Sequence, residues 1–194
     1  MSSVRLQVNL DALAENFHQL RRRGGQNKPI NMSAAVVKAN GYGLGMSFVA
    51  RRLYQEGCRR FFVATVAEGV QLRSQVPDAH IYVLAGATSQ TLGDLTTYQL
   101  IPVLNTRQQC ELWSPTRQAA ALHIDTGMHR LGISWDDDLT QLPALQLELL
   151  MTHFARADEW SDTLRVQQTQ RFENCFAVLR EQHPDILASL NNSA

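Results

Sequence analysis

The chain has 194 residues, of which 44% are hydrophobic, and this is enough apolar surface for one domain with a substantial core. Lys plus Arg and Asp plus Glu are equal at 18 each, so the overall charge favours neither nucleic acid nor a membrane surface as a partner. The chain has no apolar run of signal-peptide length at its start and no stretch that could span a membrane, so we expect a cytoplasmic protein.

The first predicted elements are a helix and a strand. A helix is predicted over residues 10–23, where apolar residues at spacings of three and four define one face and Asn9 or Asp11 provides the cap. A strand is predicted over residues 34–37, whose small or β-branched side chains are typical of a strand buried on both faces of a parallel sheet. Lys38 ends this strand, and a glycine-rich turn follows.

The rest of the chain continues the alternation of helices and strands. Further helices are predicted over 46–56, 68–74, 90–98, 106–113 and 165–182, and further strands over 61–65, 81–85, 101–104, 119–125, 147–154 and 186–192. Pro102 weakens the case for its strand because proline has no N–H. This order predicts an α/β fold, namely a (β/α)8 barrel of the TIM type with about seven of its eight strands. Seven strands leave two free edges, so we expect another segment to be needed for closure.

Lys38 is the first candidate for chemistry. It stands at the carboxyl end of a predicted parallel strand, where the loops of α/β proteins converge. Apolar neighbours remove part of its hydration, which favours the neutral amine and makes a nucleophile or a base possible. The alternative is a solvated lysine at a strand end.

Two further sets of residues have simpler interpretations. The cysteines Cys58, Cys110 and Cys175 are odd in number and widely spaced, which argues against a disulfide framework or a zinc site and favours packing residues in a reducing compartment. The acidic run at residues 136–138 is interpreted as a solvated turn or a helix cap rather than a metal site, because metal ligands must converge in space.

Three motifs, in order, resemble those of alanine racemases. Residues 36–45, VVKANGYGLG, resemble the lysine motif V-K-A-N-A-Y-G-H-G of that family, which binds pyridoxal 5′-phosphate. Residues 123–132, HIDTGMHRLG, and 151–155, MTHFA, match the next two motifs, and a weaker match closes the chain at 192–194. The resemblance implies that residues 1–194 are a partial cofactor-binding barrel, and that the carboxyl-terminal β domain of the family is absent from them.

The resemblance also assigns roles to the first motif. Lys38 would hold the cofactor covalently and handle the substrate proton on the D-alanine side. Tyr42 would contact the cofactor phosphate, with an aromatic ring packed beneath the loop as the alternative. A tyrosine from the β domain of a partner subunit would serve the other face, and no residue of this chain matches it.

The later motifs would complete the cofactor site. By the resemblance, Arg130 contacts the phenolic oxygen of the cofactor and the substrate carboxylate, and His153 lies against the ring. Asn192 and Ser193 match a cofactor-binding pair in which Ser193 donates to the phosphate. His123 occupies the place of a lysine that is carbamylated in some members, so no carbamate is expected. The backbone nitrogen of Met128 would contact the substrate.

The predicted function is therefore alanine racemisation with pyridoxal 5′-phosphate, which supplies D-alanine for peptidoglycan in a homodimeric enzyme. This chain alone is expected to be inactive. One alternative is a single-domain pyridoxal-phosphate-binding protein of cofactor homeostasis, which the loop at 123–132 argues against. Another is a non-catalytic relic of a disrupted racemase gene.

Overall fold

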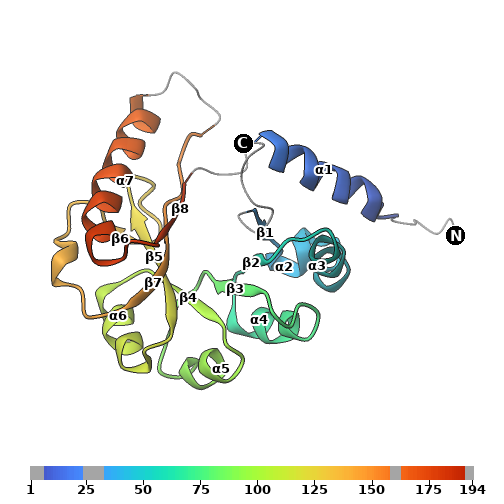
Figure 1. Cartoon of the computed structure of the whole chain (residues 1–194), viewed down its shortest axis with the longest axis horizontal. Coiled ribbons are helices and arrows are strands. Elements are labelled where there is room, and N and C mark those ends of the chain that lie inside the picture. The colour runs from blue at the N-terminus through green and yellow to red at the C-terminus, as the bar shows by residue number, and fades with distance from the viewer. Residues whose placement is uncertain (1–6, 24–32, 158–162, 191–194) are drawn as a thin grey trace, which may run out of the picture. The chain divides into compact units, whose positions relative to one another are not determined.

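The computed structural model describes residues 7–23, 33–157 and 163–190. Contacts within the chain gather into two compact units, residues 1–83 and 84–194, which we describe one at a time. In Figure 1 the first unit runs from blue to green and the second from green to red. None of the helices in the described ranges is both long enough and apolar enough for a membrane crossing.

The first unit is built on three parallel strands. It contains, in order, α1 (Leu10–Arg23), β1 (Ala34–Val36), α2 (Lys38–Tyr42), α3 (Met46–Gln55), β2 (Arg60–Val63), α4 (Val66–Arg73) and β3 (His80–Val83). β2 lies between β1 and β3, with Ala35 opposite Phe61 and Phe61 opposite Ile81. The aromatic rings of Phe62 and Tyr82 stack at 4.6 Å between centroids. Phe61, Ile81 and Tyr82 are fully buried, so the middle of this sheet forms the core.

Helix α1 begins at a side-chain cap and is attached to α3. The side chain of Asn9 accepts two backbone hydrogen bonds from the first turn, which confirms one of the two predicted caps. Asp11 pairs with Arg52 at 2.5 Å, and His18 pairs with Glu56 at 2.8 Å. Polar contacts therefore join α1 to α3 through Arg52 and to Glu56, the C-cap residue of α3.

The second unit is built on four pairings between parallel strands. It contains α5 (Leu92–Thr97), β4 (Ile101–Leu104), α6 (Arg107–Trp113), η2 (Ser114–Thr116), β5 (Ala119–Asp125), β6 (Ile133–Ser134), η3 (Leu139–Gln141), β7 (Gln146–Met151), α7 (Thr163–Gln182) and β8 (Leu187–Ser189). The strand order is β4, β5, β7, β8, and the short β6 also pairs with β5. Trp113, Leu122 and Phe172 are core side chains, and the indole N–H of Trp113 donates to the carbonyl of Gln118 at 3.1 Å. Figure 1 shows α7 beside the strands of this unit.

Every predicted helix and strand occurs in the predicted order, and α1 has the predicted bounds. β4 includes Pro102 and pairs with β5 through Val103 and Leu104, so Pro102 is not among the residues of this pairing. Asp138 caps η3 by accepting from the N–H of Thr140, which confirms the cap interpretation of the acidic run.

Several details of the strands differ from the prediction. The prediction that β1 is buried on both faces is wrong, because alternate side chains of a strand face opposite ways and only Ala35 lies on the buried face, while Ala34 and Val36 are exposed. The strand expected to reach residue 154 ends at Met151, where its pairing with β8 ends. β6 was not predicted, since two residues show no periodicity. The strand expected over 186–192 is β8, and residues 191 and 192 lie outside the described residues.

Candidate active site

The turn after β1 has a left-handed backbone. Lys38 begins α2, and Ala39, Asn40, Gly41 and Tyr42 have φ of 51°, 54°, 65° and 55°. This conformation costs a non-glycine residue about 1–2 kcal/mol. Several such residues in succession persist only where surrounding interactions hold them, and such strain is typical of functional sites.

Hydrogen bonds hold this turn to the start of α3. The Gly41 N–H donates to the carbonyl of Val37 at 2.8 Å. The carbonyl of Asn40 accepts from the Gly45 N–H at 2.9 Å, and the Asn40 side chain accepts from the Met46 N–H at 2.9 Å. Asparagine and glycine are the residues that tolerate left-handed geometry best, so the sequence suits the turn.

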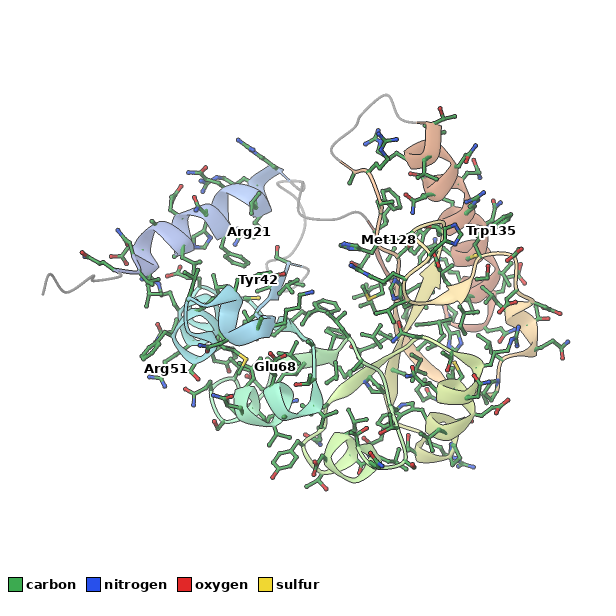
Figure 2. The ribbon with its side chains drawn as sticks, turned by 180° about the vertical axis from the view of Figure 1, so that it is seen from behind. Arg21, Tyr42, Arg51, Glu68, Met128 and Trp135 are labelled. Atoms are coloured by element: carbon green, nitrogen blue, oxygen red, sulfur yellow. The ribbon has the colours of Figure 1, made fainter. Side chains whose placement is uncertain are left out.

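Lys38 itself is half-buried at the carboxyl end of β1. Val37 before it is buried, and its N–H donates to the carbonyl of Phe62 at 2.9 Å, so the pairing with β2 continues up to the lysine. Tyr42 is 61% exposed, which contradicts the alternative that its ring packs beneath the loop. Figure 2 shows Tyr42 on this turn.

Glu68 joins this turn to the loop after β2. It is the third residue of α4, and with the N-cap Thr65 it forms a reciprocal capping box. Its Oε2 accepts from the N–H groups of Ala64 at 2.7 Å and Thr65 at 3.3 Å, and its Oε1 accepts from the Ala39 N–H at 2.7 Å. One carboxylate therefore contacts two strand-to-helix loops, one of them directly after Lys38. Figure 2 labels Glu68. Sequence reasoning missed Glu68, although the Thr65-x-x-Glu68 spacing is the signal of a capping box.

In the second unit, Asp125 organises the loop that carries Arg130. Its Oδ1 accepts from the N–H groups of Gly127 at 2.9 Å, Met128 at 2.9 Å and His129 at 3.1 Å. Burial alone would raise the pKa of Asp125, but the three N–H donors outweigh burial and the pKa lies below its usual value. The Met128 N–H, which the resemblance assigns to the substrate, is thus donated to Asp125 in this structure.

The same loop returns to β5 at its other end. β6 pairs with the end of β5, and the Trp135 N–H donates to the carbonyl of Asp125 at 3.1 Å. Gly132 lies so close to β5 that an added Cβ would be 2.6 Å from the backbone nitrogen of Asp125. Arg130 is exposed, in a loop attached to β5 at both ends. Figure 2 labels Met128 and Trp135, which lie on either side of Arg130 in the sequence.

His123 is a buried and neutral histidine in β5. Its Nδ1 lies 2.9 Å from Oδ1 of Asn105. The Asn105 amide nitrogen donates to two backbone carbonyls at 2.8 and 3.0 Å, so its oxygen accepts from the Nδ1–H of His123 and Nε2 keeps its lone pair. Burial is the main cause that lowers the pKa of His123 to about 4; Asp125 opposes this shift, and His153 and Arg130 add to it.

Buried polar groups join the loops that carry Arg130 and His153. His153 is half-buried and lies two residues beyond β7 instead of at its end. The hydroxyl groups of Thr152 and Thr126 are 2.8 Å apart, and the Gln168 amide donates to the Thr126 hydroxyl at 3.2 Å. Both loops follow the carboxyl ends of parallel strands, which is where active sites form in this type of fold.

The predicted site residues are divided between the two units. Lys38 and Tyr42 belong to the first, and Arg130 and His153 belong to the second. Asn192 and Ser193 lie outside the described residues, so their roles stay predictions.

A comparison with protein families identifies the chain. The model of the family described as "Alanine racemase, N-terminal domain" matches residues 8–194. The chain belongs to this family. The match covers every candidate site residue of the alanine racemase N-terminal domain described above.

Individual alanine racemases match nearly the whole chain. "Alanine racemase, biosynthetic" of Agrobacterium fabrum is 37% identical over 197 residues, which cover 96% of this chain and 49% of the relative. The alanine racemase of Rhodospirillum rubrum is 38% identical over 202 residues, which cover 97% of this chain and 52% of the relative. The chain therefore spans about half the length of the relatives that it matches.

Solved alanine racemase structures share the fold. The alanine racemase of Bartonella henselae, with covalently bound pyridoxal phosphate, matches with a TM-score of 0.80 and 27% identity over 96% of this chain and 56% of that one. The alanine racemase of E. faecalis matches with a TM-score of 0.77 and 26% identity over 96% of this chain and 58% of that one. The predicted fold class, an incomplete (β/α)8 barrel of the alanine racemase type, is confirmed.

Proposed function

We propose that residues 1–194 are the pyridoxal-phosphate-binding barrel portion of an alanine racemase, which interconverts L-alanine and D-alanine for peptidoglycan synthesis. The main support is the family match over residues 8–194, because it includes the lysine motif and the arginine loop in their expected order. The covalently bound pyridoxal phosphate of the Bartonella henselae relative supports the choice of cofactor.

The chemistry of the side chains fits an anionic aldehyde. Lys38 offers an amine at the end of a strand, next to a buried valine. Tyr42 offers an exposed hydroxyl that can donate to a phosphate. Arg130 is exposed and carries the fork of N–H donors that suits carboxylate or phenolate oxygens, and the half-buried imidazole of His153 supplies a flat surface.

Each residue then has a defined task. When bound, pyridoxal phosphate withdraws electrons from the substrate Cα and makes its proton removable. The Lys38 amine would hold the cofactor covalently. Once the substrate amino group has displaced it, the freed Nζ would take or return the Cα proton on the D-alanine side. Arg130 binds the alanine carboxylate through parallel hydrogen bonds. Tyr42 and Ser193 donate to the phosphate, and Asn192 is a further cofactor-binding residue.

The neutral state of His123 supports the role of Arg130. A pKa of about 4 leaves this imidazole uncharged at neutral pH. A cation in this position would repel the Arg130 guanidinium and would compete with it for an anion. The uncharged imidazole therefore leaves Arg130 as the cation that receives the substrate carboxylate.

The second base comes from outside these 194 residues in this proposal, because the chain spans about half of its relatives and no residue in it matches the family tyrosine. Residues 1–194 alone would then bind the cofactor without racemising alanine, and the complete enzyme would be a homodimer. The three free and buried cysteines support a reducing compartment, the cytoplasm.

Proton exchange at the alanine Cα tests the proposal. In heavy water with added cofactor, the purified chain should exchange the Cα proton of D-alanine faster than that of L-alanine and form little of the opposite enantiomer. Lys38→Ala should abolish this exchange. Racemisation at the rate of full-length relatives would contradict the proposal that the second base lies outside residues 1–194. Cofactor binding without any proton exchange would favour the alternative of a cofactor-homeostasis protein. Absence of both cofactor binding and proton exchange would favour the alternative of a non-catalytic relic.

A further inference from the structure

We propose that Glu68 is a positioning residue for Lys38, an inference that rests on the proposed function. The Ala39 N–H, in the peptide that follows Lys38, donates to Glu68 Oε1 at 2.7 Å. The other carboxylate oxygen accepts from the Ala64 N–H at 2.7 Å. Glu68 therefore ties the Lys38 turn to the end of β2.

The contact with Ala39 is separate from the helix cap. A capping box needs one acceptor for the N-cap N–H, and Oε2 of Glu68 supplies it to Thr65 at 3.3 Å. Oε1 is directed to a residue 29 positions earlier in the sequence. Because the acceptor is a carboxylate, this hydrogen bond is stronger than one between neutral groups.

The bond ends on the first of the four left-handed residues. Ala39 has φ 51° and ψ 50°, which an alanine does not favour. Without the bond, the peptide between Lys38 and Ala39 would relax toward right-handed geometry and would rotate the Cα–Cβ direction of Lys38 relative to β1. Glu68 thus acts through the backbone and does not itself touch the substrate.

Two variants separate positioning from capping. Glu68→Gln keeps the size of the side chain but replaces one oxygen by an NH2 group, which cannot accept from an N–H. The remaining oxygen satisfies more donors when it faces the Ala64 and Thr65 N–H groups, and the NH2 group then faces Ala39. Thr65→Ala is the matched control, because it removes the hydroxyl that accepts from the Glu68 N–H at 3.3 Å and leaves the carboxylate bond to Ala39 in place. Both variants weaken the cap of α4.

The first measurement is cofactor attachment to Lys38. The chain is incubated with increasing pyridoxal phosphate and reduced with borohydride, and the label on the Lys38 peptide is measured by mass spectrometry. Glu68→Gln should bind about tenfold more weakly, the effect of losing one hydrogen bond to a charged group. Thr65→Ala should bind like the wild type, even where both variants lower the melting temperature. The circular dichroism of the bound cofactor should change in Glu68→Gln alone.

The second measurement needs no cofactor. Amide hydrogen exchange at Ala39 should be faster in Glu68→Gln and unchanged in Thr65→Ala. Equal cofactor affinity in Glu68→Gln and the wild type, or an equal loss in Thr65→Ala, would overturn the positioning role. If the wild type attaches no cofactor at Lys38, the proposed function fails; unchanged exchange at Ala39 in Glu68→Gln overturns the inference about Glu68 independently.

Discussion

Gly132→Ala should destabilise the second unit and displace the loop that carries Arg130. The added Cβ would lie 2.6 Å from the nitrogen of Asp125, 2.9 Å from the carbonyl carbon of Ile124 and 3.0 Å from the oxygen of His123. All three are backbone atoms of β5, so no side-chain rotation relieves the contact. Gly132 also has φ of 111°, which side-chain-bearing residues rarely adopt.

The size of the effect follows from these two terms. Overpacking costs about 1–3 kcal/mol, and strained backbone costs about 1–3 kcal/mol. Alanine also lowers the conformational entropy of the unfolded chain, which offsets about 0.4–1 kcal/mol of this cost. We expect a net loss of roughly 3 kcal/mol in the free energy of unfolding, which lowers the melting temperature by about 6–12 °C for a chain of this size.

Urea and thermal denaturation followed by circular dichroism measure this loss. Gly93→Ala is the matched control, because Gly93 lies in helix α5 and its added Cβ would meet nothing within 4 Å. This control should be neutral or more stable by up to about 1 kcal/mol. A Gly132→Ala protein within about 1 kcal/mol of the wild type would refute the close return of the loop onto β5.

Three further predictions concern buried groups of the second unit and the cysteines. The pKa of His123 is about 4 in the folded chain and 6.5 when unperturbed; its contribution to stability should therefore be complete above pH 6.5 and lost as the pH falls toward 4, by roughly 3 kcal/mol. Between pH 6.5 and pH 4, urea denaturation should show a smaller loss of stability in His123→Gln than in the wild type, and an equal loss would contradict this. Thr126→Val leaves Thr152 and Gln168 short of a buried partner and should cost about 1–3 kcal/mol; the double variant with Thr152→Val should cost less than the sum, and strict additivity would argue against the hydroxyl pair. Burial raises the pKa of Cys110 and Cys175 to about 11, so a thiol reagent at neutral pH should label them only after unfolding.

The parts of the fold that depend on local sequence could be predicted. The apolar spacing of residues 10–23 and the cap at Asn9 located α1 because both signals lie within a few residues of each other. The handedness of the Lys38 turn was not predictable in the same way. It depends on Ala39 accepting an unfavourable φ, and the bond that holds Ala39 comes from Glu68, which is remote in sequence.

The candidate site shows the same division. The motifs located Arg130 and His153 in the chain, but the bond between Thr126 and Thr152 that joins their loops depends on the folding of separate strands. β6 escaped prediction because it exists through the return of Gly132 onto β5, not through any pattern of its own residues.

The site of covalent cofactor attachment tests the central claim most directly. After incubation with pyridoxal phosphate, borohydride reduction and proteolysis, mass spectrometry locates the modified lysine; the chain has one other candidate, Lys28. We predict that the cofactor is attached to Lys38 and that Lys38→Ala carries none. Label on Lys28, or equal label on both lysines, would contradict the account.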